Sequence, residues 1–296
     1  MSTSTSTSTS TSTGAGAGAG ASPGPSPAAA MPGLLRTGVA RIGVELKTFA
    51  RNRQAMFFTF SLPVLFLVLF GAIFHGEIKG SGVDFRQYFV AGMMATGIFG
   101  TGFANLAIRV AMDQDDGTLK RLAGTPMPKG AYFIGKLGSV VVAAAVQSAL
   151  MLTLGVALYG LRVPTDPLRL LTFVWVFLLG VMGTSLLGIA YSRIIKKARA
   201  APAVVQPPYL VLQFISGVFF YFGSIPGFLR TTASLFPLKW MAQGLRSVFL
   251  PAAFAAREPG GAWNRPLTAL ILGAWVVGGF ALVLLTFRWR GRSDEG

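Results

Sequence analysis

Six long stretches of this chain contain no charged residue, and they limit the possible folds more than any other feature. They are residues 55–74, 87–108, 137–161, 170–192, 201–229 and 266–287, and each has at least 20 residues. A helix of about 20 apolar residues crosses the ~30 Å hydrocarbon layer of a bilayer. A charged residue at mid-helix costs about 2.5–3.5 kcal/mol on insertion, so its exclusion from all six stretches predicts six transmembrane helices.

The composition supports an all-α integral membrane protein. The mean hydropathy is +0.60 and 12% of residues are charged, whereas about a quarter are charged in soluble domains. The chain has no Cys and a single His, His75, which excludes a disulfide framework, a thiolate metal site, a Cys nucleophile and a His cluster. The net charge of +16 does not indicate nucleic-acid binding, because the basic residues lie at the ends of apolar stretches.

Two segments precede the first predicted span. Residues 1–31 consist largely of Ser-Thr and Gly-Ala repeats, and we expect a disordered tail that is not a signal peptide. Residues 32–54 have apolar side chains at helical spacing and basic side chains between them: Leu35, Val39, Ile42, Leu46 and Phe49, against Arg36, Arg41, Lys47, Arg51 and Arg53, with one acid, Glu45. This pattern predicts an amphipathic interfacial helix on anionic lipid; the alternative is an amphipathic helix packed on a soluble domain.

The distribution of Lys and Arg predicts the orientation of the chain. Of the 26 basic residues, 17 lie in the N-terminal flank, the segments 109–136 and 193–199, and the C-terminus with Arg288, Arg290 and Arg292. The other nine lie in the opposite loops, with Lys79 in the first of them. The positive-inside rule therefore places both termini, including the tail at 291–296, in the cytoplasm of a cell-membrane protein. The five basic residues between 230 and 265 are the feature that fits this orientation least well.

Prolines divide the fifth stretch and the external segment at 223–265. Pro207 and Pro208 lack backbone donors, so we expect the fifth helix to start near Tyr209. In the external segment, Pro226, Pro237 and Pro251 separate short re-entrant helices whose Lys239 and Arg246 are expected to reach the lipid headgroups. The segment, with Trp240 at its centre, is either an external gate or a lid that only packs, and both interpretations stay open.

Two motif-like segments do not predict nucleotide sites. GAYFIGKL at 130–137 matches the first seven positions of the phosphate-loop pattern, but Leu137 replaces the Ser or Thr that reaches magnesium. GTGFAN at 100–105 lies inside a predicted span, where small residues instead predict close helix packing, as do the pairs Thr184 with Gly188 and Ala274 with Gly278. The six stretches offer no residues for a hydrolase or metal site. The chain is therefore not expected to be an enzyme, and its driving force is expected to come from elsewhere.

The polar loop at 109–136 is the candidate contact for a partner. It holds three of the ten carboxylates, Asp113, Asp115 and Asp116. A short helix at about 108–122 would present DQDDGTLKRL to that partner, and the TPMP sequence that follows would end it.

From residue 34 to 290 the chain resembles the membrane permease subunit of type-2 ABC exporters. The resemblance rests on the basic amphipathic segment, on the loop DDGTLKRLAGTPMPKGAYFIGK, and on FFYFGSIPGFLRTTASLFPLKWMAQGLRSVF before the last span. Family members usually have a Glu before Gly-Thr-Leu, then Thr-Pro and a final Gly-Lys. Asp115 and Asp116 occupy the acidic position here, and the shorter carboxylate leaves open whether the contact to the ATPase is the same. Residues 55–290 would form the six-helix permease domain.

The resemblance implies that the loop is a coupling helix seated on a separate ATP-binding subunit. Two permeases, identical or related, would face two such subunits, which would hold ATP and magnesium, so the permease itself needs no cofactor. The coupling residues would be Asp113, Asp115, Asp116, Gly117, Thr118, Leu119, Lys120, Arg121 and Leu122. Within this set, Leu119 and Leu122 would form the apolar anchor. The alternative is a docking or assembly protein that recruits a cytoplasmic partner without transport.

The transport path and the substrate are less defined by the sequence. Aromatic and amide side chains within the predicted spans are candidates for the path: Phe57, Phe58, Phe99, Phe103, Asn105, Gln147, Gln213, Phe219 and Phe220. Contact with lipid or with the core is the other interpretation of each Phe. The substrate class stays open between a hydrophobic drug-like compound and a lipid-linked glycan.

Overall fold

The computed structural model describes residues 33–78 and 80–287, and the regular elements in these ranges are helices. An isolated antiparallel bridge joins Glu77 to Asp84. The predicted all-α class is therefore confirmed for the described residues. The predictions made for residues 1–31 and 291–296, and for the charges at Lys79, Arg288, Arg290 and Arg292, lie outside these ranges.

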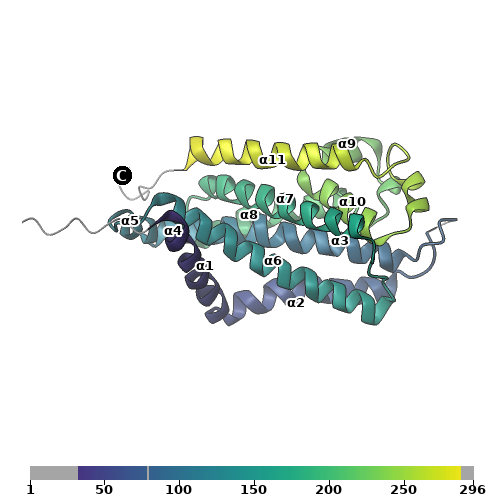
Figure 1. Ribbon diagram of the computed structural model, residues 1–296, viewed down its shortest axis with the longest axis horizontal. Helices are drawn as coiled ribbons and strands as arrows, with labels where there is room; N and C mark the ends of the chain where they lie inside the picture. The colour runs from purple at the N-terminus through teal and green to yellow at the C-terminus, as the bar shows by residue number, and fades with distance from the viewer. Residues whose placement is uncertain (1–32, 79, 288–296) are drawn as a thin grey trace, which may run out of the picture. The chain divides into compact units, whose positions relative to one another are not determined.

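Five helical segments are long and apolar enough to cross a membrane. They are α2 (Arg53–Ile73), α3 (Phe85–Phe99) continued through the π-helix η1 (Gly100–Asn105) into α4 (Leu106–Asp115), α6 (Lys129–Tyr159), α7 (Pro167–Tyr191) and α11 (Arg265–Thr286). The axes of these helices are roughly aligned with one another, whereas the axis of α1 (Leu34–Arg51) is steeply inclined to them (Figure 1). An amphipathic helix before the first span is confirmed.

The ends of these helices follow from residues at their termini. Side-chain oxygens of Asn52, Asp84 and Asp166 accept backbone N–H bonds at the starts of α2, α3 and α7, over 2.7–3.0 Å. These bonds satisfy donors that a helix leaves open at its first turn. Gly160, with a φ of 61°, ends α6 in the left-handed conformation that glycine adopts without strain.

The prediction of one helix over residues 201–229 was wrong. The helix α8 (Ala201–Ile215) has 15 residues and a length of about 22 Å, which is shorter than the hydrocarbon layer. Gly217, with a φ of 71°, follows its end, and the short helices η4 (Phe222–Ser224) and α9 (Gly227–Ser234) come next. The left-handed turn at Gly217 therefore divides this uncharged stretch.

The expected start of α8 at Tyr209 was also wrong, because the helix includes Pro207 and Pro208. A proline at 208 cannot donate to the carbonyl of Val204. The Tyr191 hydroxyl donates to that carbonyl instead, over 3.3 Å. A side chain from α7 thus supplies the hydrogen bond that the helix cannot make for itself.

Close packing between α7 and the π-helix depends on glycine. A Cβ atom added at Gly188 would lie 2.7 Å from the Phe103 carbonyl oxygen and 2.8 Å from that of Gly102. The predicted close packing is confirmed at Gly188 and is wrong at Gly278, where an added Cβ would meet nothing within 4 Å. On α11 the neighbouring Gly279 packs closely against Leu186 instead. The rotation of α11 about its own axis decides which of its glycines faces α7. The spacing of small residues in the sequence does not determine that rotation.

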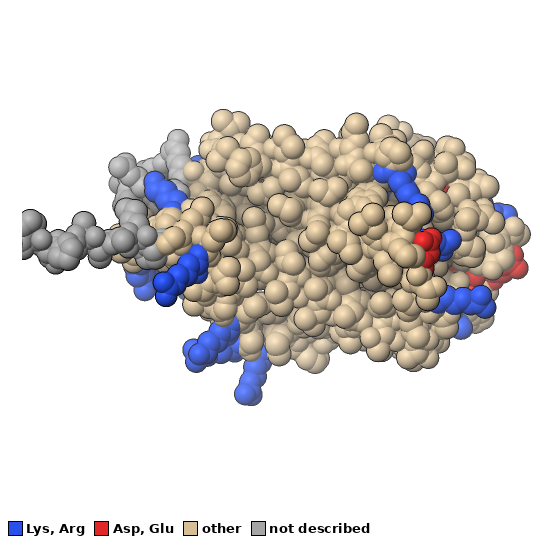
Figure 2. Space-filling model, viewed as in Figure 1, with Lys and Arg blue, Asp and Glu red and all other residues tan. Residues whose placement is uncertain are grey.

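The span that begins with α3 lies at the centre of the bundle. Of its most apolar window, 89% is buried, against 17% for α2 and 22% for α11. The helix α10 (Pro237–Phe249), which follows α9, packs on α3, α7 and α11, and all 13 of its residues are buried. On the face drawn in Figure 2, an uncharged band separates two ends that carry the charged side chains. The exposed apolar surfaces of α2 and α11 suit contact with lipid.

Candidate functional site

The predicted coupling loop forms two short helices at one end of the bundle. The helix α4 ends at Asp115, and α5 (Thr118–Ala123) follows after a turn at Asp116 and Gly117. Gly117 has a φ of 69° and turns the chain between them. The TPMP residues 125–128 are not helical, and α6 begins at Lys129. The predicted break is confirmed, and the helix predicted over 108–122 is divided at Gly117.

The tip of this loop carries exposed charges. Asp116, Lys120 and Arg121 are exposed, and an Arg121 guanidinium nitrogen donates to the Asp116 carbonyl over 3.0 Å. Leu119, in contrast, is 1% exposed and packs within its own chain. Leu119 is therefore wrong as an anchor for a partner, and Leu122, which is partly exposed, is the remaining apolar candidate. Thr118 is also partly exposed.

The other two carboxylates of the loop make contacts within the chain. Asp113 accepts a hydrogen bond from the Tyr132 hydroxyl over 2.8 Å and lies 2.7 Å from the Lys136 ammonium. The Asp115 carboxylate accepts the backbone N–H of Ala198 over 3.0 Å. Asp113 and Asp115 therefore hold the base of the loop against α6 and against the segment after α7.

A buried network of charges connects this loop to α1 and α6. The Lys136 ammonium, on α6, lies 2.7 Å from Glu45 on α1 and 2.7 Å from Asp113 on α4. Arg41 lies 3.1 Å from the second oxygen of Glu45. Lys136 is 3% exposed and Glu45 5%. We refer to Glu45, Asp113 and Lys136 as the inner triad, since they join three helices through one ammonium group.

The sequence contains two local signals of the inner triad. Glu45 is the single acid on a basic amphipathic helix, and Lys136 directly precedes an uncharged stretch. Lys136 is also the last residue of the family's Gly-Lys pair. In the structure, residues 130–137 form the first turns of α6 rather than a loop.

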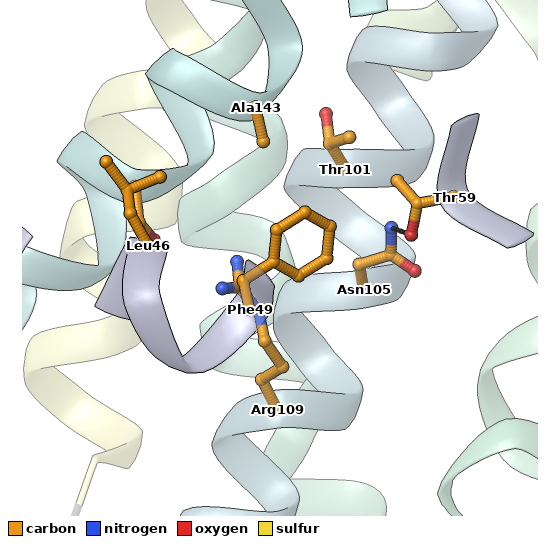
Figure 3. A pocket seen from close by; sticks show the side chains of 8 residues that line it. Leu46, Phe49, Thr59, Thr101, Asn105, Arg109 and Ala143 are labelled. Atoms are coloured by element: carbon orange, nitrogen blue, oxygen red, sulfur yellow. Dashed lines mark hydrogen bonds between the residues drawn. The ribbon is translucent and has the colours of Figure 1, made fainter. Parts of the chain in front are cut away.

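A small cavity lies beside the π-helix, where α1, α2, α4 and α6 meet. Its volume is about 10 Å³, and it is lined by Leu46, Phe49, Thr59, Thr101, Asn105, Arg109, Ser139 and Ala143. Asn105 donates to the Thr59 hydroxyl over 3.1 Å, and the Arg109 guanidinium lies 5.7 Å from the Phe49 ring centroid (Figure 3). A cavity of this size holds about one water molecule and no transport substrate. A π-helical turn within an α-helix is rare and occurs frequently at functional sites.

The residues predicted for the transport path do not line one common cavity in the described chain. Phe57 and Phe58 are 63% and 58% exposed on α2, and Phe220 is 44% exposed. Phe99 and Phe103 are buried and stacked with ring centroids 5.2 Å apart, and Phe219 is also buried. Gln147 and Gln213 are buried on α6 and α8, whereas Asn105 borders the small cavity. The path thus remains a prediction.

The opposite end of the bundle holds a second buried cluster, centred on α10. Arg246, 1% exposed, lies 3.3 Å from Glu258 and stacks on Tyr88 with its guanidinium carbon 3.9 Å from the ring centroid. The Lys239 ammonium lies 3.4 Å from the Trp240 ring centroid and donates to Gln243 over 2.6 Å. The prediction that Lys239 and Arg246 reach the headgroups was wrong, because both cations point into the protein and meet aromatic rings.

Burial changes the protonation of Lys239. Removal of its ammonium from water lowers the pKa of Lys239, the Glu258 charge opposes this shift and the Arg246 charge adds to it, and together they place the pKa at about 8. Glu258 is paired with Arg246, and Lys239 contacts an aromatic ring, that of Trp240, and an amide, that of Gln243. No group of three His, Cys, Asp or Glu that could hold a metal ion occurs among the described residues.

Comparison with known protein families agrees with this architecture. Residues 42–250 match the family model described as ABC-2 type transporter. The matched region begins in α1 and ends directly after α10, so it includes the inner triad, the α4–α5 loop, and Lys239 and Arg246 of the cluster on α10, whereas Glu258 lies beyond it. A comparison with curated proteins finds no match.

Proposed function

Because the chain belongs to the ABC-2 type transporter family and has several membrane-crossing helices, we propose that it is the membrane subunit of an exporter driven by a separate ATPase. The observation that carries this proposal is the inner triad behind an exposed, charged loop. The family assignment shows a multi-pass membrane protein, and the coupling arrangement and the cargo are the parts that we propose.

The proposed contact with the ATPase is the α4–α5 tip. Its exposed charges, Asp116, Lys120 and Arg121, suit a polar interface, although such pairs contribute only about 0–1 kcal/mol each. ATP and magnesium would be bound by the partner, and this chain would supply no group to the hydrolysis. The remaining predicted contacts are Gly117, which sets the turn, and the partly exposed Thr118 and Leu122.

A displacement of the α4–α5 tip would be transmitted to three helices, α1, α4 and α6. The helix α4 continues through the π-helix into α3, and Lys136 ties α4 to α1 and α6. Breaking a buried ion pair costs about 3–5 kcal/mol, because an uncompensated charge stays behind. The triad therefore favours joint displacement of α1, α4 and α6 over sliding between them.

We also propose six crossings with both termini in the cytoplasm. The helix α8 contacts α4 at one end of the bundle and α9 at the other, so α8 and residues 216–226 would together make the sixth crossing. Irregular backbone is tolerated at membrane depth where protein covers it, and Ser216, Gly217 and Val218 are buried. The cell membrane is the proposed location.

A second copy of the chain, or a related permease, would complete the path. Phe57, Phe58 and Phe220 are on the surface of this protomer, so they would line a path only where another subunit faces them. The proposed cargo is a hydrophobic drug-like compound or a lipid-linked glycan. On this proposal, Lys239, Trp240 and Arg246 would stabilise the closed outer end through the buried cluster on α10.

The test is co-purification of the chain with its candidate ATPase, followed by ATP turnover in vesicles. We expect Asp116→Lys with Arg121→Glu to abolish stimulation of ATP turnover by the permease while leaving thermal unfolding unchanged. Lys47→Glu, a charge reversal on the exposed side of α1, is the matched control and should retain stimulation. Equal stimulation by all variants would contradict coupling through the tip. Binding without any change in ATP turnover or transport would instead favour the docking function.

A further inference from the structure

A hollow of about 480 Å³ lies at the outer end of α7, α10 and α11. It is lined by Arg169, Ser247, Ala252, Ala262, Trp263, Asn264, Arg265 and Pro266. We refer to it as the outer hollow. Its volume is in the range of small-molecule sites, and the coupling mechanism makes no use of it.

Two arginines give the outer hollow its charge. Arg169 donates through one terminal nitrogen to the carbonyls of Val248 and Leu250, over 3.4 and 3.3 Å, and Arg265 donates to that of Ser247 over 3.3 Å. These carbonyls lie at the end of α10, so they fix both guanidinium groups in place. Each guanidinium has five N–H donors, and the buried Nε of Arg265 has no partner in the described chain.

The nearby carboxylates do not neutralise this pair of cations. Asp166 lies 4.0 Å from Arg169, its side chain is 51% exposed, and one of its oxygens accepts the N–H of Leu168. A contact of this length and exposure is weak and screened by salt. Glu258 is paired with Arg246 instead. The outer hollow therefore keeps excess positive charge.

Its position and its other residues also suit an anion at the membrane surface. The helix α11 starts at Arg265 without a side-chain cap, and the N-terminal end of a helix favours negative charge. Trp263, partly exposed, stacks on Phe254 at a centroid distance of 6.1 Å. Trp is enriched at the headgroup level of membranes, and the starts of two spans, at Pro167 and Arg265, mark that level here.

We propose that the outer hollow binds a phosphate group, the chemistry that an anionic phospholipid headgroup and free phosphate share. Arg169 and Arg265 would approach the phosphate oxygens from two sides, and Trp263 would pack against the glycerol or acyl region of a lipid. Guanidinium groups suit this task because their planar donors match the spacing of phosphate oxygens. The proposal does not depend on an ATPase partner.

The experiment measures binding to the purified full-length chain in uncharged detergent. One arm titrates dioctanoyl phosphatidylglycerol, and the other titrates inorganic phosphate. Arg169→Gln with Arg265→Gln should weaken binding about tenfold or more. Arg162→Gln, an exposed charge at the same end outside the hollow, is the matched control and should bind as the wild type does. A double replacement by Lys retains the charge and should weaken binding less than the Gln variant.

The two arms identify the source of the phosphate. Binding of the lipid alone, lost in the Gln variant, supports a headgroup site, and binding of inorganic phosphate with the same loss supports a site for free phosphate. Far-UV circular dichroism verifies that the Gln variant is folded, since Arg169 and Arg265 also bond to α10. If the Gln variant is misfolded, the Lys variant and Trp263→Leu carry the test. Wild-type affinity for both probes in the folded variants would overturn the proposal.

Discussion

At the scale of single residues, Lys136 is the side chain with the most consequence for the proposed coupling. Its ammonium is 2.7 Å from each of two carboxylates that belong to different helices. Lys136 and Glu45 are buried and the Asp113 side chain is 20% exposed, so water replaces a lost partner poorly. Removing the cation would leave Glu45 and Asp113 facing each other as two like charges in a poorly hydrated space.

We expect Lys136→Met to lower the free energy of unfolding by about 3–5 kcal/mol, because two carboxylates lose the ammonium that they share and Arg41 still pairs with only one of them, Glu45. Lys47→Met, at an exposed position on α1, should stay within about 0.5 kcal/mol of the wild type. Denaturant unfolding in detergent micelles measures both. Equal stability of the two variants would show that the inner triad contributes nothing to the fold.

Lys239 gives a second prediction at this scale, which concerns pH. The pKa of Lys239 is about 8 in the folded chain and about 10.4 in an unfolded one. Between these values the unfolded state binds more protons, so the free energy of unfolding rises with pH. From pH 8 to 10 we expect this residue to add about 2 kcal/mol. Unfolding of Lys239→Met over the same range should lack this gain, and an identical pH profile would contradict the prediction.

At the scale of elements, the contact of α7 with the π-helix positions the helix that leads to the coupling tip. Gly188 allows α7 to approach the backbone of Gly102 and Phe103. Both residues belong to the π-helix η1, and a Cβ built at Gly188 would lie within 3 Å of their carbonyl oxygens. This contact holds the central span in place between the buried cluster on α10 and α4.

We expect Gly188→Ala to destabilise the chain by about 1–3 kcal/mol, because its methyl group would meet backbone atoms that have no space to move. Gly278→Ala is the matched control, since it lies in a helix and faces open space. That change should be neutral or stabilise by up to about 1 kcal/mol. Thermal unfolding of both variants checks the prediction, and the reverse order would refute it.

At the scale of the whole molecule, the proposed orientation assigns a side of the membrane to each charged end. The chain has no natural cysteine, so single cysteines can report the side without background. Thr165 lies before α7 and Lys196 after it, and both are exposed. They belong to opposite ends of one span.

We expect a membrane-impermeant maleimide to label Thr165→Cys in intact cells and Lys196→Cys only after the membrane is opened. The positive-inside rule gives this result, because the segment at 193–199 holds four basic residues. Gel electrophoresis detects the labelling as an increase in the apparent mass of the protein. Labelling of Lys196→Cys in intact cells would reverse the orientation and place the coupling tip outside.

The sequence alone determined the membrane class, the five helices of membrane-crossing length in the described residues, the amphipathic helix, and the loop that the family resemblance singles out. These features depend on local properties: the exclusion of charge from a stretch, helical spacing, and prolines or glycines at helix ends. Pro226 and Pro237, for example, lie at the starts of α9 and α10. The composition of each segment was sufficient to identify it.

The tertiary structure alone decided which charges meet. Glu45 and Lys136 are 91 residues apart in sequence, and nothing near either residue indicates the other. The burial of Leu119 and Arg246 also depends on neighbouring helices. So does the hydrogen bond that Tyr191 donates to α8 in place of the missing backbone bond. A buried polar group is stable only beside its partner, and the folded arrangement of helices is what brings that partner within reach.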